Sequence, residues 1–264
     1  MNKILILGNK GMLGHVVERY LKETGKYWVI GSNREDFDVI KEDPRELIKK
    51  HNPDFIINCI GILNNSKDVE AMKKVNTLFP HKLAELSRDH NFRCIHISTD
   101  CVFNGTEGYP YSEESFPCPK DFYGASKAAG EIVDNHNLTI RTSIIGPELK
   151  ENGIGLFKWV CDNKGKEVNG FCNAIWSGVT TFELAKAIDY FIENKTIGLI
   201  NFTLGKISKR DLIILINKIY DLGMTINDNM DFVEKRVLTS NREEMTQYPK
   251  KSFLEMIQEM KGWY

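Results

Sequence analysis

The sequence lacks a long apolar run and lacks an excess of charge of either sign. The uncharged stretch 55–65 is broken by Asn58 and Gly61 and falls far short of the roughly 20 apolar residues of a membrane span. The net charge is −1, from 35 Lys and Arg against 36 Asp and Glu, which removes the electrostatic case for nucleic acid as the main partner. The apolar run at 4–7 is too short for a secretory signal. We therefore expect a cytoplasmic protein with no membrane and no nucleic-acid partner.

Cysteine and histidine are present, but not in metal-binding or redox spacings. None of the six cysteines forms a C-x-x-C pair, and none of the six histidines belongs to H-E-x-x-H. The closest approach, Cys94-x-His96, lies in an apolar run with no further ligand nearby, so we expect no metal site. The thiols are expected to be reduced and mostly buried, and His96 is expected to be a core histidine.

Short β-rich runs alternate with amphipathic stretches along most of the chain. Continuous apolar runs of this kind occur in parallel sheets that are covered on both faces, and the stretches between them follow the helical period. The sequence therefore predicts an α/β fold with a doubly wound, Rossmann-type parallel sheet. The expected strands are 3–7, 27–30, 54–59, 93–98, 138–140 and 199–203, and the expected helices are 13–21, 78–86 and 182–191.

A glycine-rich turn, Gly8-Asn9-Lys10-Gly11-Met12-Leu13-Gly14, follows the first expected strand. Glycine at this junction permits a tight turn, close approach of a pyrophosphate to the backbone, and close packing of the next helix, whose positive end faces the anion. The spacing G-x-x-G-x-x-G differs from the commonest fingerprint, and a turn without a ligand is the alternative. We interpret the turn as a dinucleotide site that includes Gly8, Gly11 and Gly14.

The regular alternation ends after Ile145-Gly146-Pro147-Glu148, where turn-forming residues close a strand. We expect a dinucleotide-binding Rossmann domain over residues 1–147 and a smaller, interleaved lobe over 148–264, with segments at about 170–205 returning to the sheet. Helices are expected at 207–222 and 253–260. Their apolar faces either pack the lobe or form the seam of a homodimer.

The end of the second expected strand indicates which dinucleotide is bound. An acidic residue at this strand tip would hold the ribose hydroxyls of NAD, but the chain continues as Asn33-Arg34 instead. The Arg34 guanidinium is suited to pair with the 2′-phosphate of NADP. The alternative is a solvated arginine paired with Glu35 or Asp36. We favour NADPH and leave NADH open.

Tyr123 and Lys127 stand four residues apart in a stretch expected to be helical through Ile132, so both side chains lie on one face. A neighbouring cation favours the phenolate and lowers the pKa of a tyrosine from its usual value of about 10, which makes proton transfer feasible near neutral pH. Upstream, Thr99 ends the fourth expected strand, where a hydroxyl can bond to a reacting carbonyl. The alternatives are a surface Tyr–Lys pair and a plain Thr–Asp turn.

In this order, the glycine turn, Ser98-Thr99, Tyr123 and Lys127 resemble the extended short-chain dehydrogenase/reductase superfamily. The nearest likeness is to the dTDP-4-dehydrorhamnose reductases, through the stretches 98–105, 110–113, 123–131 and 140–143. The resemblance implies NADPH-dependent reduction of a 4-keto sugar nucleotide in deoxysugar precursor synthesis, with the substrate bound mainly by residues 148–264. It leaves open whether the carrier is dTDP, UDP or GDP.

The resemblance also implies a role for each matching residue. Tyr123 would be the general acid, Thr99 would orient the substrate carbonyl, and Lys127 would hold the nicotinamide ribose and acidify the phenol. The cofactor would be bound by Gly8, Gly11, Met12, Leu13, Gly14, Asn33, Arg34, Asp38, Val39, Ile60, Gly61, Ile62, Ser98, Tyr123 and Lys127, and the substrate by Thr99, Asp100, Cys101 and Trp176.

Two positions depart from those reductases, which have Tyr where this chain has Cys101 and Trp where it has Ile144. The loss of two aromatic contacts predicts a reshaped substrate pocket. Trp176 is the candidate to replace the lost stacking surface. That Trp176 is instead a core residue is an equally good interpretation.

Three other functions share parts of this pattern. Nucleotide-sugar dehydratases carry Glu where this chain has Cys101, and a thiol is a poor substitute for a carboxylate base. An epimerase with retained NAD needs the same hydroxyl, phenol and lysine. A non-catalytic relative, the regulatory subunit of methionine adenosyltransferase, is disfavoured by the intact Tyr123 and Lys127.

Overall fold

The computed structural model describes residues 1–264 except 64, 67 and 107. Its centre is a six-stranded sheet in the order β10-β5-β4-β3-β1-β2, and every neighbouring pair is parallel. This confirms the predicted doubly wound sheet, and all six expected strands are present, with no end shifted by more than two residues. Their bounds are β1 Lys3–Leu7, β2 Trp28–Ser32, β3 Phe55–Asn58, β4 Arg93–Ile97, β5 Leu138–Arg141 and β10 Gly198–Asn201.

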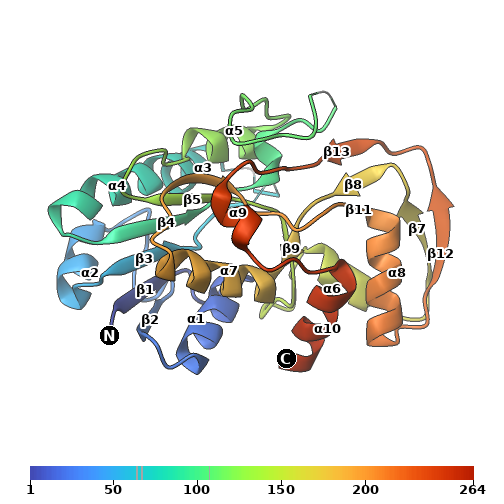
Figure 1. The fold of residues 1–264 in the computed structure, drawn as a ribbon, viewed down its shortest axis with the longest axis horizontal. Helices are drawn as coiled ribbons and strands as arrows, with labels where there is room; N and C mark the ends of the chain where they lie inside the picture. Colours follow the sequence, from blue (N-terminus) through green and yellow to red (C-terminus); the bar gives the residue numbers. More distant parts are fainter. Residues whose placement is uncertain (64, 67, 107) are drawn as a thin grey trace.

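Helices cover both faces of the sheet, as the side chains of β1 show. Ile4 and Ile6 pack in one apolar cluster with α1 (Gly14–Glu23) and α7 (Thr181–Glu193), and Leu5 and Leu7 pack in the other with α2 (Pro44–His51) and α4 (Phe79–Asp89). Successive strand residues point to opposite faces, so an uninterrupted apolar run fits only between two helical layers (Figure 1). In the part of the chain that the structure describes, no helix is both long enough and apolar enough to cross a membrane.

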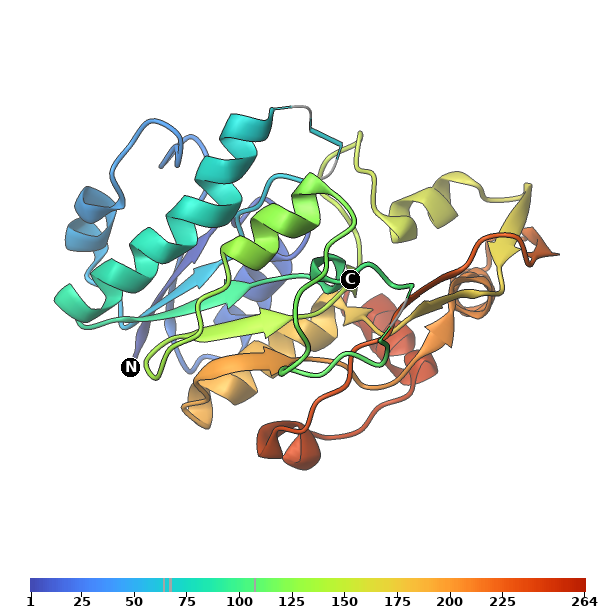
Figure 2. The same cartoon turned by 90° about the horizontal axis from the view of Figure 1, so that it is seen from above.

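The strand order reverses between β1 and β3, because β1 pairs with β2 on one side and with β3 on the other. Ligands of open α/β sheets bind at such a switch point, outside the carboxyl ends of the strands. The glycine turn leaves β1 at this place and residues 59–62 leave β3. Seen from above, α5 (Phe122–Ala129) lies beside the continuous helical segment that runs through α3 (Val69–Met72), η1 (Lys73–Leu78) and α4 (Figure 2).

A smaller lobe lies beside the carboxyl ends of the sheet (Figure 1). Its apolar core includes Val160, Trp176, Ile216 and Met260, all nearly inaccessible to solvent. Between the lobe segments, α7 and β10 return to the main sheet. The remaining elements are η2 Asp100–Val102, β6 Ile144–Ile145, α6 Leu156–Asp162, β7 Glu167–Phe171, β8 Ala174–Trp176, β9 Val179–Thr180, β11 Ile207–Ser208, α8 Lys209–Tyr220, β12 Thr225–Asn229, β13 Glu234–Arg236, α9 Glu243–Gln247 and α10 Phe253–Trp263.

All the expected helices are present, and each has at least one end that differs from the prediction. The helix that carries Tyr123 stops at Ala129 rather than Ile132, and Gly130, which follows it, packs so closely on the carbonyl oxygen of Asn76 that a Cβ would overlap it. The helix expected from residue 207 begins at Lys209, since the Ser208 side chain caps it by accepting a hydrogen bond from the amide of Asp211.

Candidate active site

Helix α5 presents Tyr123 and Lys127 one turn apart, toward the carboxyl end of β4. Asp121 caps the helix by accepting a hydrogen bond from the amide of Gly124 at 2.8 Å. Gly124 in turn packs on the short helix η2, where a Cβ would overlap the carbonyl oxygen of Cys101. This close approach brings the phenol of Tyr123 next to the residues that follow β4.

The structure brings Thr99 and Tyr123 together, as the sequence predicts. Thr99 caps η2, and its hydroxyl donates to Asp100 Oδ1 at 3.2 Å and accepts from the amide of Cys101 at 3.2 Å. Burial raises the pKa of Tyr123 well above its usual value, and a hydrogen bond with the Thr99 hydroxyl opposes that shift. The expectation that Lys127 lowers this pKa is not met here, because desolvation dominates and the ammonium points elsewhere.

Lys127 is buried, with 4% of its surface exposed. Its Nζ donates to the carbonyl oxygen of Ile97 at 2.7 Å and lies 3.4 Å from Nε2 of His96. Burial lowers the pKa of Lys127 to about 8, and nearby Glu131 and Cys59 oppose that shift. The side chain thus enters from α5 and ends beneath the carboxyl end of β4.

The glycine turn forms a close-packed junction between β1 and α1. Gly8 has a φ of +79°, which a residue with a side chain rarely adopts, and its carbonyl oxygen lies where a Cβ on Gly14 would be. Within the described part of the chain, the amides of Met12 and Leu13 donate no hydrogen bond. These amides stand at the start of α1, where the helix dipole favours an anion.

Arg34 and Asn33 lie at the end of β2, beyond the glycine turn. The Arg34 side chain is 78% exposed, and its Nε lies 3.4 Å from Asp38 rather than from the expected partners Glu35 or Asp36. Asn33 donates to Asp36 through its side-chain amide at 2.8 Å. Arg34 is therefore held loosely and is free to turn toward a ligand at the turn.

Val39 lies beside a surface cavity of about 460 Å³ between residues 39–44 and the η1–α4 segment. This cavity is lined in part by Pro44, Leu78 and Lys82. The Asp38 carboxylate accepts a hydrogen bond from the amide of Ile40, which lowers the pKa of Asp38.

Ile62 is held by Asn76, a residue that sequence reasoning missed. Asn76 is fully buried, accepts from the amide of Ile62 at 2.9 Å, and donates to the carbonyl of Ile62 and to the Ser126 hydroxyl. Because Ser126 lies on α5, this one side chain ties the loop after β3 to the helix that carries Tyr123. Asn76 lies in the π-helical turn η1, an irregularity often found at functional sites, but no sequence signal marks it.

Ser98 points into a buried ion pair and away from the turn. Its hydroxyl donates to Glu131 at 2.7 Å, and Glu131 forms a bidentate pair with Arg141 in which both side chains are at most 4% exposed. The hydroxyl's proton is thus used within the protein, and the contact of Ser98 with the cofactor stays a prediction.

Arg236 is the second side chain that sequence reasoning missed, and it comes from β13 in the lobe. Its Nη1 lies 3.0 Å from Sγ of Cys101, and Glu234 holds Nη2 at 2.9 Å. Burial raises the pKa of Asp100, and Arg236 is the main charge that opposes the shift. The lobe thus delivers a cation to the predicted substrate residues Asp100 and Cys101.

Trp176 is a core residue, which is the alternative that we predicted beside a role in stacking on the substrate. It is 6% exposed, its indole N–H donates to the Ser143 hydroxyl at 2.8 Å, and its ring packs on Phe253. Gly178 lies against the same ring. These contacts leave little of the ring for a ligand, because the lobe core encloses it.

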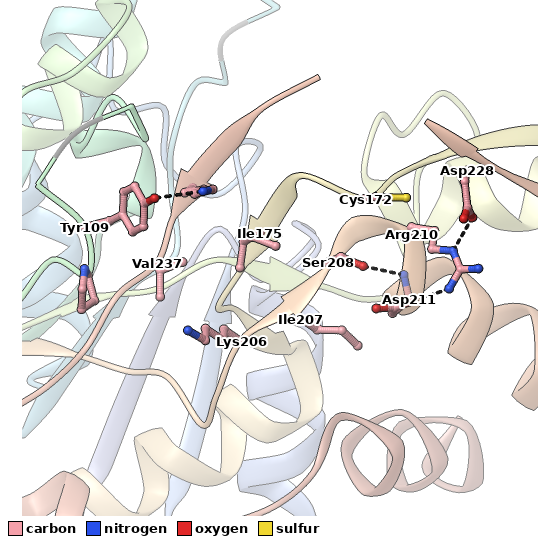
Figure 3. Close-up of a pocket in the computed structure, with 12 residues that line it drawn as sticks. Tyr109, Cys172, Ile175, Lys206, Ile207, Ser208, Arg210, Asp211, Asp228 and Val237 are labelled. Atoms are coloured by element: carbon pink, nitrogen blue, oxygen red, sulfur yellow. Dashed lines mark hydrogen bonds and ion pairs between the residues drawn. The ribbon is translucent and has the colours of Figure 1, made fainter. Parts of the chain in front are cut away.

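A separate cavity of about 700 Å³ lies between the lobe and residues 109–110, and its lining contains none of the predicted catalytic residues (Figure 3). It opens on one face of the sheet β11-β8-β13, where Lys235, Ile175 and Ser208 are neighbours in register. Arg236 lies on the opposite face of that sheet, toward Cys101. Among the described residues, no cluster of His, Cys, Asp or Glu could hold a metal ion.

A parallel six-stranded sheet with a glycine turn at its switch point, and with Thr99 after β4 facing Tyr123 and Lys127 on α5, defines a Rossmann-type α/β protein with a candidate dinucleotide site. Comparison with protein families identifies the member of this class. The chain belongs to the family described as RmlD substrate binding domain, which matches residues 1–166.

Individual relatives agree with this assignment. A dTDP-4-keto-6-deoxy-D-glucose reductase of Streptomyces niveus is 33% identical over 132 residues, 48% of this chain and less than half (45%) of that relative. A dTDP-4-dehydrorhamnose reductase of Aggregatibacter actinomycetemcomitans is 27% identical over 216 residues, 77% of this chain and 74% of that protein. The solved dTDP-4-dehydrorhamnose reductase of Bacillus anthracis str. Ames, in complex with NADP, shares the fold, with a TM-score of 0.86 and 20% identity over 100% of this chain and 99% of that one.

Proposed function

We propose that this protein catalyses the NADPH-dependent reduction of a 4-keto sugar nucleotide to the hydroxy sugar nucleotide, in cytoplasmic deoxysugar precursor synthesis, with NADH as a weaker alternative cofactor. The contact of Thr99 with the half-buried side chain of Tyr123, at the switch-point end of the sheet, carries the proposal. The names of the relatives, which are reductases of dTDP-bound keto sugars, support the substrate class.

The residues present fit a dinucleotide. The free amides of Met12 and Leu13, at the start of a ten-residue helix, suit its diphosphate, and the packed glycines leave the backbone accessible there. Arg34 would pair with the 2′-phosphate, Asp38 and Val39 would lie by the adenine, and Ile60, Gly61 and Ile62 would line the cleft. The bound cofactor would supply the hydride.

Tyr123 is in the protonation state that reduction requires. The phenol keeps its proton at neutral pH, as a tyrosine with the ordinary pKa of about 10 also does, and it can donate that proton to the oxygen of the keto group as that oxygen gains charge. Thr99 would hold the same oxygen by a hydrogen bond, and Lys127 would hold the ribose hydroxyls next to the phenol. The protein would thus contribute position and one proton.

The sugar nucleotide would lie between η2 and the lobe. Asp100, Cys101 and Arg236 meet there, and they combine a carboxyl group, a small thiol and a guanidinium where relatives carry an aromatic residue. In this proposal residues 1–147 mainly bind the cofactor and residues 148–264 mainly bind the substrate. The apolar faces of α8 and α10 pack in the lobe core, which is one of the two predicted alternatives, and a homodimer stays part of the proposal.

The test is turnover of a panel of 4-keto sugar nucleotides on dTDP, UDP and GDP carriers, followed by the loss of absorbance of the reduced nicotinamide. Replacement of the proton donor in Tyr123→Phe is expected to lower kcat by at least about 100-fold, while NADPH binding and the unfolding midpoint stay close to wild type. Wild-type rates in that variant, or no turnover of any panel member by the wild type, would overturn the proposal.

A further inference from the structure

Behind Tyr123, three buried polar side chains form a chain of contacts from β3 to α5. Asn58 on β3 and His96 on β4 are partners in the strand register, and both are fully buried. Asn58 Nδ2 lies 3.2 Å from His96 Nδ1, and His96 Nε2 lies 3.4 Å from Nζ of Lys127. Which atom donates and which accepts in the Asn58–His96–Lys127 contacts determines which nitrogen atoms carry protons.

The orientation of Asn58 determines the tautomer of His96. The Asn58 carbonyl oxygen accepts a hydrogen bond from the amide of Ile60 at 3.2 Å, so its NH₂ group faces the imidazole. An NH₂ group only donates, and Nδ1 must therefore accept. A neutral imidazole that accepts at Nδ1 carries its proton on Nε2, the nitrogen that faces Lys127.

The Nε2–H tautomer matches a neutral Lys127. An ammonium has three donors and no acceptor, so an N–H of a charged Lys127 would face the Nε2–H of His96 without a hydrogen bond. A neutral amine has one lone pair, which can accept from Nε2–H. A neutral amine still donates to the Ile97 carbonyl oxygen at 2.7 Å. Both contacts of Nζ are satisfied only when the amine is uncharged.

The groups around Lys127 leave its neutral and charged forms similar in free energy at mildly alkaline pH. Burial holds the pKa of His96 well below 6.5 and lowers that of Lys127 to about 8. Two groups favour the charged lysine, Glu131 just beyond α5 and Cys59 after β3, while His81 on α4 and Lys127 itself disfavour a charged His96. Glu131 already forms an ion pair with Arg141, so it compensates the positive charge of Lys127 only in part.

We propose that His96 is a positioning residue that stabilises the neutral amine of Lys127, and that cofactor binding at mildly alkaline pH is therefore coupled to the uptake of one proton by Lys127. The proton comes from solvent and turns the amine into an ammonium. Nζ then ceases to accept from His96 and donates to the ribose hydroxyls. The contact given up is long, at 3.4 Å, and is correspondingly weak.

The first test needs no cofactor and follows the imidazole nitrogens of His96 by NMR in ¹⁵N-labelled protein. The signals are assigned by their loss in His96→Gln. At mildly alkaline pH we expect the neutral Nε2–H tautomer. The Nδ1–H tautomer would overturn the inference. Since this inference rests on the proposed cofactor site, its failure remains distinguishable from failure of the function, which would appear as no NADPH binding at any pH.

The second test measures the dissociation constant of NADPH below and above pH 8. In the wild type, affinity is expected to fall about tenfold per pH unit above about pH 8, because the free protein must gain a proton to bind. His96→Phe removes the Nε2–H donor. It is expected to raise the pH at which NADPH affinity begins to fall, here called the break, by about one pH unit or more. His96→Gln, which keeps a side-chain N–H, is expected to restore the wild-type break.

The matched control is Cys94→Ala, which changes an equally buried side chain two residues earlier on the same face of β4. A purely structural role for His96 would weaken the fold in both variants and leave the break where it is. An identical break in wild type and His96→Phe would overturn the inference.

Discussion

Lys127 combines a functional position with an unfavourable environment. Its amine is held almost entirely out of water, and Glu131, the carboxylate among the described residues that raises its pKa, is already paired with Arg141. A group in this situation destabilises the folded state while it is charged. The proposed reaction explains why it is retained, since the amine lies one helical turn from the phenol of Tyr123.

Lys127→Met is expected to abolish turnover and yet raise the free energy of unfolding by about 2 kcal/mol at pH 7. The pKa of Lys127 is about 8 in the folded protein against an ordinary 10.5, so the unfolded chain binds more protons between these two values. Wild-type stability therefore gains from this group as the pH rises from about 8 to 10.5, and the advantage of the variant disappears over that window.

Urea unfolding of both proteins at neutral and alkaline pH checks this expectation. Lys22→Met, at an exposed lysine on α1, is the control and is expected to change stability by less than about 0.5 kcal/mol at either pH. A variant less stable than wild type at pH 7 would contradict the account.

Arg34 allows a test of cofactor choice at a single exposed residue. Arg34→Ala is expected to weaken NADPH binding about tenfold and to leave NADH binding unchanged, because only NADPH carries the 2′-phosphate. Fluorescence titration with each cofactor measures the two constants, with Arg45→Ala, another exposed arginine paired with an aspartate, as the control. Equal losses for both cofactors would remove Arg34 from the proposed site.

At the scale of elements, the site depends on how closely α5 approaches η2. Gly124 follows Tyr123 directly, and no side chain fits between its Cα and the carbonyl of Cys101. Asn76 ties the other side of α5 to the loop after β3. Two contacts thus determine where the phenol stands relative to Thr99.

Gly124→Ala is expected to lower the free energy of unfolding by about 1–3 kcal/mol and kcat by at least about tenfold, because the added methyl group overlaps a backbone oxygen and displaces α5. Thermal unfolding and steady-state rates measure both effects. The control is Gly262→Ala in α10, where the added Cβ would meet nothing within 4 Å and where alanine should stabilise the helix by about 0.5–1 kcal/mol. Wild-type activity in Gly124→Ala would show that the helix tolerates the displacement.

At the scale of the whole molecule, the lobe completes the site. Arg236 on β13 reaches Cys101, which lies more than a hundred residues earlier in the sequence, and it partly compensates the buried carboxyl group of Asp100. The cavity in Figure 3 lies on the other face of the same small sheet. Substrate contacts are therefore expected on the Arg236 face.

Arg236→Gln is expected to lower kcat/KM for the keto sugar nucleotide about tenfold or more without changing the dissociation constant of NADPH, because the cation is lost on the substrate side alone. Arg210→Gln, an ion-paired arginine that lines the cavity in the lobe, is the control. If Arg210→Gln were the more damaging change, the substrate would have to be placed in the cavity instead.

The sequence by itself determined the parallel sheet, the glycine turn, and the shared helical face of Tyr123 and Lys127. These features follow from residue periodicity and from spacing within one or two turns of chain, which are local properties. The smaller strands of the lobe were not predicted, since two- and three-residue segments such as β9 and β8 have too little pattern to recognise.

Only the tertiary structure decided the chemistry around those residues. The raised pKa of Tyr123, the Asn58–His96–Lys127 contacts, the enclosure of Trp176 and the approach of Arg236 to Cys101 all join segments that are distant in sequence. Desolvation and hydrogen bonding depend on which groups surround an atom in three dimensions, and residue spacing along a chain carries no information about that.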